Sequence, residues 1–229
     1  MSKVEIGSLQ HLLPILVSVI LSIVVIGYAN KKLNRAQQEK LVHRFAQLIW
    51  MFLVAYHLVY IYLGGYDYAT DLPLFLCSFV ALIIPVFTYY KKYWMFEILF
   101  FWVMGGSFLG VLTPDIPLGF PSFDYFRYWL VHLGLVMIIL YYVFVLKYKP
   151  NFESVVKSIL CLQVYVGVMM LVNYVLDGNY SYLTRRPEAY TFLDYFGVWP
   201  YYILYVQLFL IPYFLVIYSP FYVLNKTKS

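Results

Sequence analysis

The chain has 229 residues, of which 63% are hydrophobic and only 12% are charged. An ordinary soluble domain carries about 25% charged residues, so this composition excludes a soluble protein and predicts a single integral membrane domain over residues 1–229. The formal net charge is +5, but Lys and Arg residues beside apolar spans usually signal orientation in the membrane. The charge therefore does not point to nucleic acid as a partner.

The apolar runs predict the architecture. A transmembrane helix needs about 20 consecutive apolar residues. Runs of this kind predict spans at residues 9–29, 41–63, 72–90, 93–112, 124–146, 155–176 and 198–221. The predicted fold class is an all-α membrane protein, a bundle of seven transmembrane helices. The joint at residues 177–197 contains Gly178, Pro187 and Gly197, and its length predicts an ordered cap over the bundle.

The basic residues predict the orientation of these spans. If the joint at residues 30–40 is cytoplasmic, 12 of the 16 Lys and Arg residues lie on that side, Lys228 among them. The other side keeps only Lys3, Arg127, Arg185 and Arg186. Because cytoplasmic loops carry an excess of Lys and Arg, this split predicts an N-terminus outside the cell and a cytoplasmic C-terminus.

Four polar side chains are predicted to lie at a similar depth on four different helices. At 1.5 Å per residue, His57 lies about 9 Å below the outer end of its span, Cys77 about 8 Å, His132 about 12 Å and Asn173 about 5 Å. Polar side chains in hydrocarbon usually face the bundle interior, where they are candidates for function. We therefore interpret these residues as one possible site, although each alone is also typical of an interhelical contact.

Other patterns narrow the chemistry. The sequence contains no P-loop, zinc-protease or EF-hand motif, so we expect neither a cofactor nor a metal. Cys77 and Cys161 are predicted to lie about 10 Å or more apart along the bundle axis, which is too far for a disulfide. Gly106 and Gly110 form a small-xxx-small pair, which usually marks a close approach between helices.

Several longer motifs resemble a known family. They are LPLFLCS (72–78), FEILFFW (96–102), LTPD (112–115), LVNYVLDGNYSYL (171–183), RRPE (185–188) and GVWPYY (197–202). In this order they resemble the bacterial YwaF proteins, whose animal relatives include transmembrane protein 164. The similarity runs from about residue 41 to residue 220. The resemblance implies a protein of the bacterial cytoplasmic membrane, and a phospholipid acyltransferase whose essential Cys corresponds to Cys77.

The chemistry of acyl transfer assigns roles to the four polar residues. A Cys nucleophile must lose its proton, and His132, or alternatively His57, is the candidate base. Asn173 is expected to donate to an oxyanion or to orient the imidazole. With Cys77 near the outer leaflet, the acyl donor is expected to be a membrane phospholipid. The expected enzyme is therefore a transacylase or a lipid acyl hydrolase, which moves the acyl chain to a lysolipid, an alcohol or water. The substrate pocket and its cap are predicted to involve Asp115, Asp177, Asn179, Tyr180 and Trp199.

Two other classes of function stay open. One is a non-catalytic lipid or small-molecule binding or transport protein, in which His57, His132, Asn173 and Asp177 line a polar pocket and Cys77 only packs. The other is a structural interaction protein. A fold by itself does not decide between these alternatives.

Overall fold

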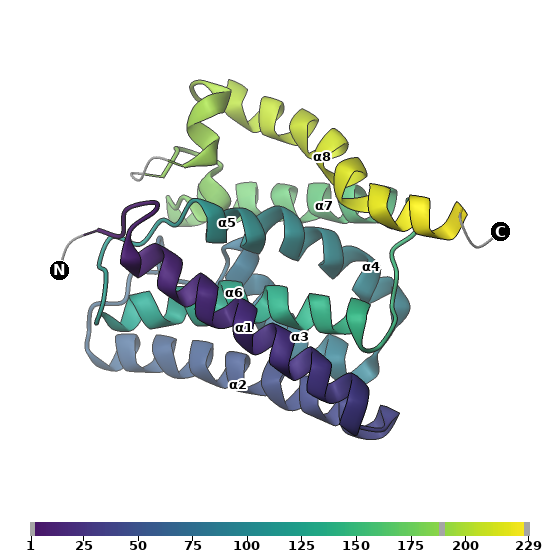
Figure 1. Ribbon diagram of the computed structural model, residues 1–229. Helices are drawn as coiled ribbons and strands as arrows, with labels where there is room; N and C mark the ends of the chain where they lie inside the picture. The colour runs from purple at the N-terminus through teal and green to yellow at the C-terminus, as the bar shows by residue number, and fades with distance from the viewer. Residues whose placement is uncertain (1–2, 188–190, 227–229) are drawn as a thin grey trace.

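The computed structural model describes residues 3–187 and 191–226 (Figure 1). Glu188 of the RRPE motif and Lys228 lie outside the described residues. The regular secondary structure of the described residues is all helical, with no strand. The helices are α1 (Leu9–Lys32), α2 (Arg35–Tyr62), α3 (Leu76–Tyr90), α4 (Tyr93–Trp102), η1 (Val103–Ser107, a π-helix), α5 (Phe108–Leu112), α6 (Phe123–Phe144), α7 (Phe152–Leu176), η2 (Tyr180–Tyr182, 3-10), η3 (Phe192–Phe196, 3-10) and α8 (Tyr201–Lys226).

Hydropathy located most of the helices well. Among the described residues, six helical segments are long and apolar enough to cross a membrane. They are α1, α2, α4 to α5 as one segment, α6, α7 and α8. Helix α3 has 15 residues and so spans only about 22 Å, less than the hydrocarbon thickness of about 30 Å. Its place as a seventh span stays a prediction.

Two helices begin earlier than the apolar runs indicate, because polar side chains cap them. Asn34 accepts a hydrogen bond from the backbone N–H of Gln37, and the Gln37 side chain accepts one from the backbone N–H of Asn34. Asn151 and Ser154 form the same reciprocal cap at the start of α7. Such capping boxes satisfy N–H groups that a helix leaves unpaired, so polar residues extend both helices beyond the hydrocarbon.

The helices run side by side, and their connections gather at two ends (Figure 1). We call the end that carries the start of α1 and the loops 63–75, 113–122, 177–187 and 191–200 the cap end. The opposite end carries the loops 33–34, 91–92 and 145–151 and the C-terminus. Helix α2 packs mainly on α3 and α6, whereas α4 packs on α7, and α8 lies against α7 and η1.

The core is aromatic and aliphatic, and the outer surface is apolar as well. Phe87 and Tyr142 are fully buried, with their ring centroids 4.4 Å apart between α3 and α6. Leu16, Ile20 and Ile23 of α1 are exposed, as are many other large apolar side chains. Soluble monomers rarely expose apolar surface of this extent, so the surface fits a bilayer.

Candidate active site

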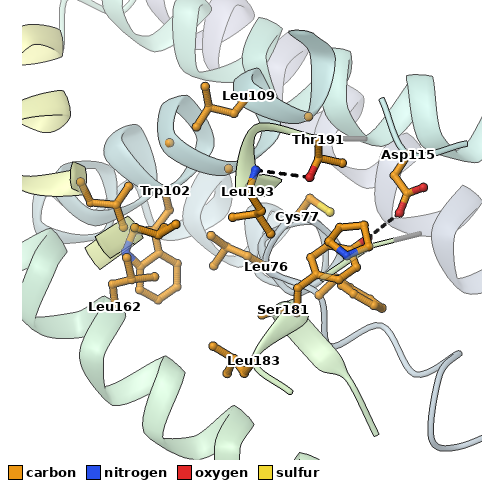
Figure 2. A pocket seen from close by; sticks show the side chains of 18 of the residues that line it. Leu76, Cys77, Trp102, Leu109, Asp115, Leu162, Ser181, Leu183, Thr191 and Leu193 are labelled. Carbon is orange, nitrogen blue, oxygen red and sulfur yellow. Dashed lines mark hydrogen bonds between the residues drawn. The ribbon is translucent and has the colours of Figure 1, made fainter. Parts of the chain in front are cut away.

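A cavity of about 380 Å³ lies at the cap end, below the loops (Figure 2). Its walls come from the start of α3, from η1 and α5, from the first half of α6, and from α7 and α8. Residues of the cap, including Leu183, Thr191 and Leu193, line it as well. Figure 2 shows Cys77 and Asp115 toward one side of the cavity, and Trp102 and Leu162 toward the other. The cavity therefore has a polar part and an apolar part.

The polar part joins Cys77 to His132. Cys77 is the second residue of α3, and the first backbone hydrogen bond of that helix runs from the N–H of Phe79 to the carbonyl of Phe75. The N–H groups of Cys77 and Ser78 therefore have no acceptor within the helix. The His132 side chain and the backbone N–H of Ser78 both lie within hydrogen-bonding reach of the Cys77 sulfur. The thiol thus has a potential base and a helix N-terminus beside it.

The hydrogen bonds of His132 fix its tautomer. Its Nδ1 lies 2.9 Å from the backbone carbonyl oxygen of Tyr128. Because a carbonyl oxygen only accepts, Nδ1 must be the nitrogen that donates, and Nε2 of the neutral ring then carries the lone pair. The imidazole of His132 is thereby in the form that can accept a proton from a thiol.

Two neighbours hold the His132 ring in place. The Tyr128 ring stacks on it with centroids 4.0 Å apart. On α5, a Cβ added to Gly110 would lie 2.9 Å from His132 Cδ2 and 3.0 Å from His132 Nε2. This contact confirms the close approach predicted from the small-xxx-small pair. The backbone of α5 therefore packs directly against the imidazole.

Further polar groups surround the pair. The Tyr182 hydroxyl donates to Asp115 Oδ2 at 3.0 Å. Burial, together with the nearby Asp115 carboxylate, raises the pKa of Tyr182 well above its ordinary value, so the hydroxyl keeps its proton. The Tyr128 hydroxyl donates to the carbonyl of Gly110 at 2.8 Å. Arg127 lines the cavity and pairs with Asp124, with its Nε 2.9 Å from Oδ1.

Comparison with protein families identifies the chain. A model described as the TMEM164 family matches residues 6–218. The chain belongs to the TMEM164 family. Comparison with curated proteins and with solved structures finds no match. The matched range of this TMEM164-family chain contains Cys77, His132 and the whole cap, so the candidate site lies within the shared part of the family.

Two residues predicted to join the site do not line the cavity. The side-chain amide of Asn173 forms two hydrogen bonds to the backbone of Tyr180 in the cap. Its Nδ2 donates to the carbonyl of Tyr180 at 3.0 Å, and its Oδ1 accepts from the N–H of Tyr180 at 2.6 Å. His57 contacts Tyr66, whose hydroxyl is 3.2 Å from Nδ1. Both residues lie at the cap end, but their side chains point to other partners. The structure therefore brings together two of the four predicted residues.

Of the residues expected in the pocket and its cap, Asp115 lines the cavity and the others organise the loops. Asp177 ends α7 in a left-handed conformation with φ of 51°. Asn179 Oδ1 accepts hydrogen bonds from the backbone N–H groups of Thr184 and Arg185. Tyr180 and Trp199 bond to backbone carbonyls: the hydroxyl of Tyr180 donates to Tyr68, and Nε1 of Trp199 donates to Leu183. These bonds connect the described loops of the cap to one another and to the ends of the helices.

Several residues that line the cavity were not predicted from the sequence. Arg127, Tyr128 and Tyr182 were not predicted, although each lines it. Arg127 carried a signal, because a basic residue within an apolar span usually faces the protein interior. Tyr128 carried another, since it lies one helical turn before His132 and shares its face. Tyr182 lies in the motif LVNYVLDGNYSYL (171–183), but the motif does not indicate which of its tyrosines lines the cavity.

Proposed function

We propose that the protein is a membrane-embedded phospholipid acyltransferase or transacylase that uses Cys77 as its nucleophile and His132 as its base. The observation that carries this proposal is the pairing of a thiol with an imidazole at a cavity that also has a long apolar part. A nucleophile beside a base is the usual arrangement for covalent catalysis. Membership of the TMEM164 family supports it, because the sequence motifs resemble relatives that transfer acyl chains.

The proposed reaction has two balanced halves. In the first, His132 Nε2 takes the thiol proton, the Cys77 sulfur attacks the ester carbonyl of a phospholipid, and the C–O bond of the ester breaks. The lysophospholipid leaves with the proton held by His132, and the acyl chain stays on Cys77 as a thioester. In the second half, His132 takes the proton of an acceptor hydroxyl, whose oxygen attacks the thioester and releases the thiol. Water as the acceptor gives a fatty acid instead.

The start of α3 offers a place for the negative charge that develops on the carbonyl oxygen. The N–H groups of Cys77 and Ser78 are free of helical acceptors, and the helix dipole favours negative charge there. Removing one such donor from an enzyme typically lowers kcat by about 100- to 1,000-fold. This role replaces the one predicted for Asn173, whose amide is bonded to Tyr180.

We further propose that the cap end faces the outside of a bacterial cytoplasmic membrane, with the C-terminus in the cytoplasm. The excess of Lys and Arg at the opposite end supports this orientation. A single Cys placed at Gln37, in a variant lacking Cys77 and Cys161, tests it. An impermeant thiol reagent should label this Cys only after cells are permeabilised. Labelling in intact cells would contradict the proposed orientation.

The decisive test of function compares wild type with Cys77→Ala in vesicles of phosphatidylcholine that carries an isotope-labelled acyl chain. We expect wild type to produce lysophospholipid and to move label to an added lysolipid, whereas the variant does neither. Bound lipid without turnover in wild type would instead support the non-catalytic binding protein. Circular dichroism and size exclusion of both proteins in detergent establish that the variant is folded.

A further inference from the structure

The apolar part of the cavity, which we call the channel, lies between Cys77 on one side and Trp102 and Leu162 on the other (Figure 2). Its walls come from η1 and α5 on one side and from α7 and α8 on the other. Apart from Gln207 on α8, the side chains on these walls are aliphatic or aromatic, and they include Leu109, Leu162, Val166, Leu210 and Phe214. A channel lined in this way fits a flexible hydrocarbon chain, because the driving force for binding is the burial of apolar surface.

Two adjacent glycines in the π-helix η1 make room for the channel. A Cβ on Gly105 would lie 2.8 Å from Phe214 Cε1, and a Cβ on Gly106 would lie 3.0 Å from Leu76 Cδ2. Side chains at these positions would therefore push into the neighbouring walls. π-Helical turns are rare in proteins, and those that do occur often lie at functional sites.

Trp102 stands at the end of the channel away from His132. Its Nε1 donates to the carbonyl of Ser158 at 3.1 Å, and its ring lies 5.7 Å from that of Tyr165, centroid to centroid. The indole is buried and held by these contacts, so it forms a fixed wall. Gly110, which contacts His132, and Trp102 are eight residues apart on one nearly continuous helix, or about 12 Å.

We infer that this channel binds the acyl chain carried by Cys77, and that Trp102 and Leu162 limit the length of chain accepted. This inference rests on the proposed function for the identity of the chain. The channel itself follows from the residues that line it. Chain selection then depends on side chains far from the reacting sulfur, because each further methylene needs space beside Trp102 and Leu162.

Alkyl methanethiosulfonates of increasing chain length test the channel without any enzymatic turnover. The Cys77 thiolate attacks the sulfenyl sulfur of the reagent, a mixed disulfide forms, and methanesulfinate leaves. The protein carries Cys161→Ala so that one thiol reacts. We expect the labelling rate to rise with chain length and then to fall at a cutoff where the chain meets Trp102.

Two matched variants on α7 test whether Leu162 limits the length of the bound chain. Leu162 is 8% exposed and lines the channel, whereas Val164 is 69% exposed and does not line the cavity. Leu162→Trp should shift the cutoff to chains shorter by several carbons, and Val164→Trp should leave it unchanged. Val166→Trp is a second channel variant, used if Leu162→Trp does not fold by circular dichroism.

The outcomes separate the channel from the proposed chemistry. An unchanged cutoff in a folded channel variant, or a labelling rate independent of chain length in the parent protein, overturns the inference. A shifted cutoff in a protein that transfers no acyl group supports the channel while rejecting the transferase. A shifted cutoff together with transferred chains shortened to the same extent supports both.

Discussion

The two ends of the bundle both hold cysteine and histidine side chains, but they differ in whether those side chains line the candidate cavity. Cys77 and His132 line a cavity of about 380 Å³. In the other half of the bundle, Cys161 packs against the hydrophobic core, and Nδ1 of His43 lies 2.9 Å from the hydroxyl of Thr88. The comparison shows that residue type alone does not identify the side chains that line the cavity, because each end holds one cysteine and one histidine of these pairs.

Several charged groups at the opposite end are paired with one another. The Glu97 carboxylate is 1% exposed and accepts hydrogen bonds from the hydroxyl of Ser154 at 2.9 Å and from Lys157 Nζ at 3.0 Å. Lys91 pairs with Glu39 at 2.7 Å on the same side. A buried charge that is satisfied in this way serves packing and helix register, so we expect this end to affect stability and not acyl transfer.

The largest difference between the two ends is expected for the cysteines. Replacing the Cys77 sulfur by a hydroxyl in Cys77→Ser should reduce acyl transfer to the background rate, because a serine needs a much stronger base to ionise. Cys161→Ser should transfer at the wild-type rate. Lysophospholipid formation in vesicles measures both variants. Equal losses in the two variants would contradict the contrast between the ends.

The second-largest difference in acyl-transfer rate is expected between the histidines of the two ends. His132→Ala removes the proposed base and is expected to slow transfer by about 100- to 10,000-fold, the usual contribution of general base catalysis. His43→Ala, at the opposite end, should leave the rate within a few-fold of wild type. The double variant Cys77→Ala/His132→Ala should be no slower than Cys77→Ala alone, since the two groups act as a unit. An additive loss argues against a catalytic pair.

A smaller effect is expected from displacing His132 without removing it. In Gly110→Ala the new methyl group meets the imidazole at about 3 Å and must shift it. A shift of about 1 Å can cost on the order of 100-fold in rate. Gly167→Ala on α7 is the control, because nothing lies within 4 Å of its Cβ position. The rate of Cys77 alkylation by iodoacetamide across pH 6–9 should change in Gly110→Ala only.

The smallest effect on activity is expected at the opposite end. Glu97→Gln removes the carboxylate that accepts hydrogen bonds from Ser154 and Lys157, so we expect a lower Tm. Acyl transfer below the transition should stay at the wild-type rate. Thermal unfolding in detergent measures Tm, and the vesicle assay measures the rate of acyl transfer. A loss of transfer at unchanged Tm would contradict a purely structural role for Glu97.

The sequence predicted where the helices lie better than which way their polar residues point. The span at residues 93–112 matches the segment formed by α4, η1 and α5, because hydropathy reports apolar length directly. It does not report the π-helical turn at Gly105 and Gly106, which depends on local packing. Helices α2 and α7 extend beyond their apolar runs because of polar caps.

The candidate site was predicted in part for a related reason. Counting residues from the end of a span gives depth, but it does not give the direction of a side chain around the helix axis. Cys77 and His132 share both depth and direction. Asn173 shares the depth, but its amide bonds to Tyr180 in the following loop. Contacts between distant segments, such as Tyr182 with Asp115, appear only once the chain is folded.

The most direct test of the account is the mass of the Cys77 side chain during turnover. Wild-type protein in phospholipid vesicles is quenched in acid, digested and examined by mass spectrometry. We expect an acyl group on Cys77 that hydroxylamine removes, and a larger acylated fraction when acceptor lysolipid is withheld. Steady lipid turnover with Cys77 free of any acyl group at every time point would contradict it.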